Sequence, residues 1–415
     1  MRWKRGIGIA ALLGLAAVSV HLVAPGPSVV QAAGRGGDPG WILGVFGDGL
    51  RTSRSSYFDF ERLAFVLYLA IVVCAAAIPM RLLKIAIVGL IAAFTLAPPL
   101  LSLDVFSYIS YARLETLHGL NPYQHMPLDI PGDAALAFIE RWRDQTSAYG
   151  PLFTLVSLPL GKLGVGAALW TAKAVIGAAT LGLTAIVARL ATQRGLDPRP
   201  AAVLVALNPL VLVHVVGGPH NDALMMLLAI AGVAAVIGHR GALGGAAIAG
   251  AVATKLSAAF IAPFALIGAE GRERWRLLAG GAAAGALIAV ASLIAFGGGL
   301  TDSLAIAGEN QHRTSRHSAP VTLAHDLGIG AGGVRVVALA AFALLVLWLL
   351  RWTWRGGDWV RAAGWAGLGL LIATSYLTPW YVIWVLPLAA IARDRALVAG
   401  SLVFTGYVLL HQVTL

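Results

Sequence analysis

The sequence predicts an all-α polytopic membrane protein, and three observations lead to this fold class. Of its 415 residues, 59% are hydrophobic and only 12% are charged. The mean hydropathy of +0.81 is too high for a soluble enzyme. The apolar residues also recur in runs of about twenty, the length that a helix needs to cross a bilayer. We therefore expect a bundle of about 11 to 13 transmembrane or re-entrant helices.

The apolar runs follow one another along the chain. A basic start, MRWKR, precedes the first run and predicts a retained signal-anchor helix, while a cleavage-like VQA at 30–32 leaves a removable signal peptide as the alternative. The later runs predict spans at 61–79, 84–101, 166–188, 200–216, 221–238, 276–297, 334–350, 361–377, 381–392 and 396–412. The predicted division is an anchor with an external segment, 1–60, and a transmembrane domain, 61–415.

The apolar run 242–268 is too long for one span and too short for two, and basic residues flank both of its ends. We expect a re-entrant hairpin or a pair of short helices, with Thr254 and Lys255 near the tip. A charge that faces hydrocarbon costs at least about 2.5 to 3.5 kcal/mol, so Lys255 must face protein or a water-filled cavity. Two interpretations stay open, a snorkelling or salt-bridged structural lysine and a ligand for phosphate.

The formal charge of +11 reflects topology rather than nucleic-acid binding, because the basic residues lie in short gaps between apolar runs. Alternating the spans from a cytoplasmic N-terminus places most Lys and Arg residues inside, as the positive-inside rule requires. A first loop, 102–165, and a second loop, 298–333, then lie outside, together with 217–222 and 375–381. Chemistry is therefore expected on the extracytoplasmic face of the plasma membrane.

An enzyme on that face must take its activated group from a membrane-carried substrate, because nucleotide-activated donors are generally absent there. A lipid-phosphate donor needs a cationic patch for the phosphate and a carboxylate that acts as a base. Asp104, Lys255, Arg313 and Arg316 supply that set.

The sequence predicts no cofactor. The single cysteine, Cys74, lies in an apolar run, so no internal disulfide is possible, and the sequence contains no redox or zinc motif. His220 with Asp222 is a fragment of a site for a hard cation, but no compact set of ligands accompanies it.

Asp104 is the strongest catalytic candidate because it follows about twenty apolar residues in LSLDVFSYISYAR, 101–113. If a helix ended there, the negative end of its dipole would disfavour the ionised carboxylate and make Asp104 a stronger base. If a new helix began there, Asp104 would be its N-cap. The amphipathic interfacial helix predicted after it ends at His118-Gly119.

The candidates for substrate binding are polar and aromatic side chains, most of them in the external segments: Tyr108, Arg113, Tyr123, His220, Asn221, Asp222, Lys255, Arg313, Arg316, His317, Trp380 and Tyr381. Each group also has a structural explanation. The tyrosines suit membrane anchors, GGPHND at 217–222 suits a capped helix start, the basic segment 308–320 suits contact with anionic headgroups, and 379–381 suits an aromatic belt at a helix break.

Five motifs occur in order along the chain: DVFSYISYARLETLHGLNPY, WRDQTSAYGPLF, GGPHNDALM, ATKLSAAFIAPF and SYLTPWYVIWVLP. With them, the chain from about residue 84 onward resembles bacterial polyprenol-phosphate-mannose-dependent α-1,6-mannosyltransferases of the actinobacterial cell envelope. These enzymes have a GT-C fold, and GT87-type enzymes look similar. The resemblance implies a GT-C bundle whose first large external loop carries a catalytic aspartate, which Asp104 matches.

The resemblance also implies a reaction. Asp104 would deprotonate an acceptor hydroxyl of a glycan or glycolipid, which attacks C1 of a polyprenyl-phosphate sugar with inversion, and Lys255, Arg313 and Arg316 would contact the donor phosphate. The leading alternative is a lipid or sugar transporter or flippase, for which inverted repeats and midplane charges are expected. No clear repeat is present, and apart from Lys173 and Lys255 the charges avoid the span centres. A noncatalytic lipid-binding scaffold is the third reading.

Overall fold

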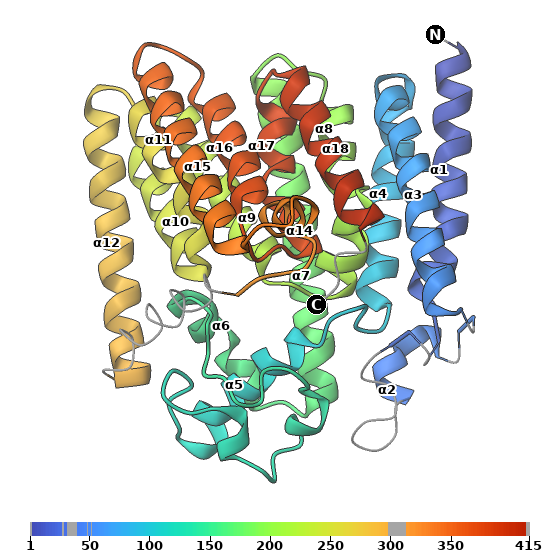
Figure 1. The fold of residues 1–415 in the computed structure, drawn as a ribbon, viewed down its shortest axis with the longest axis vertical. Helices are drawn as coiled ribbons and strands as arrows, with labels where there is room; N and C mark the ends of the chain where they lie inside the picture. Colours follow the sequence, from blue (N-terminus) through green and yellow to red (C-terminus); the bar gives the residue numbers. More distant parts are fainter. Residues whose placement is uncertain are drawn as a thin grey trace.

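The computed structural model describes residues 2–26, 29–30, 40–47, 49–50, 52–297 and 313–411. Every regular element in these ranges is helical, which confirms the predicted all-α class. The helices form a bundle with a smaller helical layer at one end (Figure 1). The predicted cleavage-like site falls partly, and 298–312 of the second loop wholly, outside the described residues.

The bundle is built from long helices and from shorter ones that are interrupted near its middle. The long helices are α1 (Arg2–Val23), α3 (Arg54–Cys74), α4 (Met80–Leu96), α7 (Val165–Gln193), α12 (Gly271–Phe296) and α15 (Ala331–Trp354). The shorter ones are α8 (Pro198–Ala206), α9 (Asp222–Ile237), α10 (Gly241–Thr254), α11 (Ala262–Gly268), α16 (Trp359–Ala373), α17 (Leu386–Ile391) and α18 (Arg395–Leu410). The layer and the loops hold α2 (Gly40–Leu43), α5 (Asp104–His118), α6 (Pro151–Gly161) and α14 (Ala319–Asp326).

The membrane character of the chain rests on five helices of the described ranges that are long and apolar enough to cross a bilayer, namely α1, α3 with its short extension to Ala77, α7, α12 and α15. A sixth candidate is α8 together with the π-helix η5 (Val211–Gly217), which are bent by 61°. Seven other apolar helices have 10 to 17 residues. The number of spans therefore stays a prediction.

Two predicted spans are broken rather than continuous. The span 200–216 divides after Ala206, because Pro209 cannot continue the helical hydrogen bonding, and the chain resumes as η5. The span 381–392 consists of the 3-10 helix η8 (Pro379–Trp384) and α17, with the break at Val385 before Pro387.

The run 242–268 forms the predicted pair of short helices. α10 ends at Thr254, Lys255 is extended with φ −157° and ψ 123°, and the 3-10 helix η6 (Leu256–Ile261) leads into α11. The start of α10 lies beside the start of α12, since the Gly241 amide donates to Glu273 Oε2 at 2.6 Å. Both ends of this hairpin therefore lie at the same end of the bundle, and Lys255 lies at its tip.

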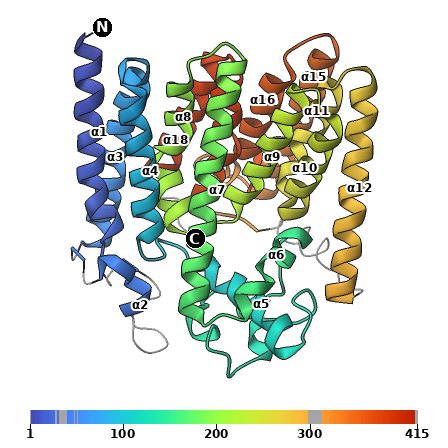
Figure 2. The ribbon, with the colours of Figure 1, turned by 180° about the vertical axis from the view of Figure 1, so that it is seen from behind.

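The layer that holds α5 and α6 is attached to the bundle through α7, which passes from one into the other (Figure 2). α5 packs on α6 and α7, and residues 105–111 at its start are all buried. The predicted amphipathic helix is the part of α5 from Ala112 on, where Leu114 is buried while Leu117 and His118 are exposed, and its place at a membrane surface stays a prediction. Its predicted end is confirmed, because Gly119 caps it in the left-handed conformation with φ 64°. α1 begins at the end of the bundle opposite to α5 and α6 (Figure 1).

Candidate active site

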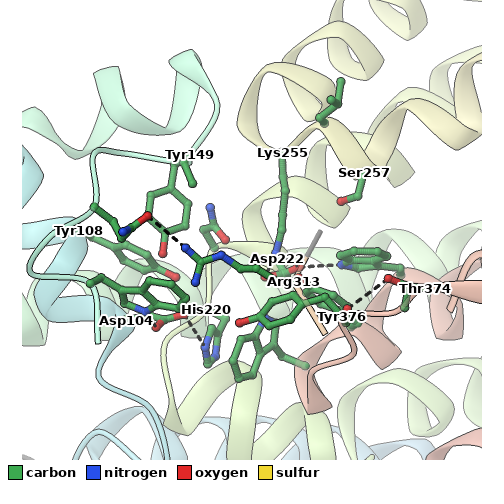
Figure 3. A pocket seen from close by; sticks show the side chains of 18 of the residues that line it. Asp104, Tyr108, Tyr149, His220, Asp222, Lys255, Ser257, Arg313, Thr374 and Tyr376 are labelled. Carbon is green, nitrogen blue, oxygen red and sulfur yellow. Dashed lines mark hydrogen bonds and ion pairs between the residues drawn. The ribbon is translucent and has the colours of Figure 1, made fainter. Parts of the chain in front are cut away.

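A cavity of about 300 Å³ lies where the α5–α6 layer meets the bundle. Its walls come from the start of α5, the loop 142–149, the start of α9, the tip after α10, and the region from the end of α16 to η8. Figure 3 shows these side chains pointing toward one another across the space. The cavity brings together the predicted residues Asp104, Tyr108, His220, Asn221, Asp222, Lys255, Arg313, Trp380 and Tyr381.

Asp104 does not lie at the end of the preceding helix, because α4 ends at Leu96 and extended chain follows. A new helix does begin here, but Asp104 is its first residue and Leu103 is the N-cap, with no side-chain cap. The expectation of a carboxylate at the negative end of a helix dipole is therefore wrong.

Two neighbours orient the Asp104 carboxylate. Trp142 Nε1 donates a hydrogen bond to Oδ1 at 3.1 Å. Oδ2 lies 3.5 Å from His220 Nε2, and the Asp104 side chain is 13% exposed to the cavity. The carboxylate is thus held in one orientation while remaining accessible to a ligand.

Arg313 lies on the other side of Trp142. Its guanidinium is stacked 4.6 Å from the centre of an indole ring, and Nη2 donates to Gln145 Oε1 at 3.1 Å. The edge of the same indole donates to Asp104, while its face contacts Arg313. Trp142 thus lies between a cation and a carboxylate in one cavity. Among the described residues, Arg313 makes these two contacts with neutral groups, so its positive charge is available there to an anionic ligand.

Lys255 forms an ion pair with Asp222 across the cavity wall. Nζ lies 2.8 and 2.9 Å from the two carboxylate oxygens, and Trp384 Nε1 also donates to Asp222 Oδ1 at 2.6 Å. Asp222 is fully buried, whereas the Lys255 side chain is 22% exposed. The salt-bridged interpretation of Lys255 is therefore confirmed, and its contact with phosphate stays a proposal.

Asn221 occupies the predicted N-cap position of α9, but its side chain makes no capping hydrogen bond. Its Nδ2 is buried without a hydrogen-bond partner among the residues that the structure describes, and the residue lines the cavity. An unpaired buried donor costs about 1 to 3 kcal/mol. The side chain is therefore better explained by a ligand acceptor than by helix capping.

The tyrosines around Asp104 are protonated donors. Burial, followed by the charge of Asp104, raises the pKa of Tyr111, and burial, followed by Tyr108 and Asp104, raises the pKa of Tyr149. The Tyr111 hydroxyl already donates to the carbonyl of Gln145 at 3.0 Å, and protonated tyrosines of this kind are poor bases. Since Asp222 is committed to its ion pair, Asp104 is the carboxylate of the cavity wall that can act as a base.

Four predicted binding residues lie outside the cavity wall: Arg113, Tyr123, Arg316 and His317. Tyr123 is buried, with its hydroxyl 2.8 Å from that of Thr154, and it packs edge-on against Phe296. Arg316 is exposed, and the carbonyl of His317 accepts from the Tyr407 hydroxyl at 2.9 Å. These contacts tie segments of the fold together.

Arg113 forms an ion pair within the first loop, away from the cavity wall. Its Nε donates to both oxygens of Asp133, at 2.8 and 2.9 Å, and His118 Nε2 lies 3.1 Å from the same carboxylate. The Asp133 side chain is only 2% exposed. The sequence shows an Arg, a His and an Asp in one loop, but it does not reveal that they meet.

Asp133 is expected to protect the first loop above about pH 4 and to lose this effect below it. Burial alone would raise the pKa of Asp133, but hydrogen bonds from Arg113, the Ala135 amide and His118 together lower it. A lowered pKa stabilises the folded state above the unfolded pKa, and this stabilisation is lost as the pH falls through the folded pKa. Limited proteolysis should cleave the loop of Asp133→Asn faster than wild type at neutral pH, with the difference vanishing in acid. Equal rates at neutral pH would contradict the prediction.

Several residues of the cavity wall were not predicted as site residues: Trp142, Gln145, Thr146, Tyr149, Ser257, Thr374, Tyr376 and Trp384. Trp142 lies in a charged stretch, 140–144, that reads as a solvated face, although a tryptophan among charges is itself a sign of a specific contact. Within the described ranges, no three His, Cys, Asp or Glu side chains come close enough together to hold a metal ion.

Comparison with known proteins places most of this site in a recognised region. A family model described as "Alpha-(1->6)-mannopyranosyltransferase, N-terminal domain" matches residues 61–269, which include Asp104, His220, Asp222 and Lys255. Alpha-(1->6)-mannopyranosyltransferase A of Mycobacterium tuberculosis is 30% identical over 341 residues, covering 74% of this chain and 66% of that protein. The protein of the same name from Corynebacterium glutamicum is 30% identical over 195 residues, covering 46% of this chain and 39% of that protein. The matched regions thus span less than two thirds of these relatives' own length.

Proposed function

Because the chain belongs to the alpha-(1->6)-mannopyranosyltransferase family, we propose that it is a membrane enzyme that transfers mannose to a glycan or glycolipid acceptor. The donor is polyprenyl-phosphate mannose, the new linkage is α-(1→6), and the reaction inverts the configuration at C1. One observation carries the proposal: an oriented, accessible carboxylate, Asp104, and the guanidinium of Arg313 line the same cavity.

In the proposed reaction, Asp104 takes the proton of the acceptor hydroxyl as its oxygen attacks C1 of the donor sugar. The C1–O bond to phosphate breaks, and its electron pair leaves with the phosphate. Arg313 stabilises the negative charge that develops there, which a cation does most effectively in a poorly hydrated cavity. A positioned base contributes typically about 10² to 10⁴-fold to such a step.

The choice of a lipid-linked donor is supported by a second cavity beside the first. This apolar groove, of about 640 Å³, runs between α10 and α12 and shares Ala148, Tyr149 and Leu256 with the active-site cavity. Apart from Tyr149, its wall consists of Gly, Ala, Val, Ile, Leu and Pro residues. A groove of this kind suits an isoprenoid chain whose phosphate reaches Arg313.

The choice of the extracytoplasmic face is supported by the distribution of charge. Basic residues lie in the first turns of α1 and α12 and in the last turn of α15. These helix ends lie at the end of the bundle opposite the α5–α6 layer (Figure 1). Since basic residues favour the cytoplasmic side, the layer with Asp104 is assigned to the outside. Nucleotide sugars are generally absent there, in agreement with a lipid-linked donor.

The test is a transfer assay with the purified protein in lipid nanodiscs. With polyprenyl-phosphate [¹⁴C]mannose and a mannoside acceptor, we expect a labelled α-(1→6)-linked product, and with GDP-mannose we expect none. Product from GDP-mannose alone would overturn the donor assignment. Proteoliposomes that move the labelled lipid across the bilayer without forming a glycosidic bond would identify a flippase instead.

A further inference from the structure

His220 is held behind Asp104 in a way that fixes its tautomer. The imidazole is 1% exposed, and it is stacked on Trp380 with ring centres 3.5 Å apart and planes 16° apart. Its Nδ1 lies 2.6 Å from the carbonyl oxygen of His214. Because a carbonyl can only accept, Nδ1 carries a proton, and the state of Nε2 is set by what faces it.

The sequence explains why the carbonyl of His214 is free to hold the ring. Around it the chain has π-helical bonding, in which Gly218 donates to Val213 and His220 to Val215. The matching donor for His214 would be residue 219, which is a proline and has no N–H. The π-helix with Pro219 thus leaves one carbonyl unpaired by the backbone, and the His220 side chain takes it.

Nε2 then faces the candidate base. It lies 3.5 Å from Asp104 Oδ2 and is buried, with no hydrogen-bond partner in the part of the chain that the structure describes. If His220 is neutral and Asp104 is ionised, two lone pairs face each other, which is unfavourable in a buried site. The dashed line between Asp104 and His220 in Figure 3 marks this contact. One proton placed on either atom turns it into a favourable hydrogen bond.

We propose that Asp104 and His220 are a dyad that shares one proton, and that His220 holds the proton that Asp104 removes from the acceptor. This inference rests on the proposed function. The active form has an ionised Asp104 and a neutral His220. When the acceptor O–H bond breaks and its oxygen bonds to C1, the proton moves to the carboxylate and then to Nε2, and the phosphate leaves with the electron pair. The dyad releases this proton to water before the next turnover.

The other charged and titratable groups around Asp104 and His220 are not expected to change their charge near neutral pH. The dyad is therefore the group expected to titrate there. Tyr108 and Tyr111 of α5 and Tyr149 have raised pKa values, because they are buried and near negative charge. Tyr376 and Tyr381 line the far wall, where Asp222 is paired with Lys255. Arg313 is always ionised. A second buried histidine, His214, lies behind the ring, 3.1 Å from Glu61. Its own titration needs a separate control.

Two substitutions separate proton transfer from tethering. His220→Asn places an amide N–H near Nδ1 and can keep the bond to the His214 carbonyl, but it removes Nε2. His220→Gln places a neutral amide near Nε2 but cannot titrate. If His220 is a dyad member, both variants lose kcat by about 10 to 100-fold. Both also lose an acidic limb of the kcat/KM profile that lies between about pH 5 and 8 in wild type. His214→Gln should keep that limb.

A purely structural role predicts a different result. His220→Asn would then keep wild-type kcat and the acidic limb, and only His220→Gln would fail. That outcome overturns the dyad while the transfer assay and Asp104→Asn still establish the mannosyltransferase.

A measurement without substrate tests the dyad even if the proposed reaction is wrong. In ¹⁵N-histidine NMR spectra, the signal lost in His220→Asn identifies His220. Replacing Asp104 by Asn removes the carboxylate that favours a proton on Nε2. The titration midpoint of His220 should therefore fall by about one pH unit or more. An unchanged midpoint would show that the two side chains do not share a proton.

Discussion

Asp104→Asn is expected to reduce kcat for mannosyl transfer by about 10² to 10⁴-fold, the largest effect of any single substitution in the cavity. In the wild-type structure Trp142 Nε1 donates to Asp104 Oδ1 at 3.1 Å, and the amide oxygen of the asparagine can still accept this hydrogen bond. The substitution therefore changes the basicity of the side chain and little of its packing. Donor binding, measured by equilibrium binding of the polyprenyl-phosphate sugar, should change by less than about tenfold, because Arg313 is untouched.

Asp144→Asn is the matched control, because Asp144 is an aspartate of the neighbouring loop that does not line the cavity. It should leave kcat close to wild type. Thermal unfolding of both variants shows whether either loses stability. If Asp104→Asn folds normally and turns over within tenfold of wild type, Asp104 is not the base.

The fold class was predictable because bilayer thickness imposes a simple length rule on apolar runs. The break at Lys255 was also predictable, since an ammonium in an apolar run must leave the lipid, and the extended backbone there agrees. Asp104, His220 and Asp222 were predicted as candidates because they are polar groups in the segments between apolar runs, and all three line one cavity.

The errors have a common physical origin. Capping predicts a local bond for Asn221, but its side chain instead faces the cavity with Nδ2 unpaired. α6 lies within the segment 102–165 that the sequence predicts as a loop, and Pro151 occupies the favourable first position of this helix. Local pattern thus locates polar residues near a site but does not choose among their local and distant partners.

The pairs that build the site are long-range and could not be read from spacing. Trp142 meets Asp104 across 38 positions, and Arg313 meets Gln145 across 168. Arg113 shows the opposite case, since it lies on α5 with Asp104, yet its guanidinium bonds Asp133 outside the cavity wall. Which residues of a helix face a cavity depends on packing partners that a single sequence does not reveal.

Lys255→Met is expected to destabilise the protein by about 3 to 5 kcal/mol, because it leaves the carboxylate of Asp222 buried without its counter-ion. Asp222→Asn should cost less. The Lys255 side chain is 22% exposed and can turn toward the cavity, while Asp222 is fully buried. The double variant Lys255→Met/Asp222→Asn should recover most of the stability lost in Lys255→Met, since it removes both charges together. Thermal unfolding of the three variants in one detergent measures these differences.

The same three variants decide whether Lys255 also contacts the donor. If the ion pair is only structural, the double variant regains a wild-type KM for the polyprenyl-phosphate sugar as it regains stability. If Lys255 also contacts the donor phosphate, the double variant regains stability but its KM stays raised. The expected increase in KM is about tenfold or more, because a charge-assisted hydrogen bond of about 1.5 to 3 kcal/mol is lost. A double variant as unstable as Lys255→Met would contradict the argument, because the buried carboxylate would then not be the source of the loss.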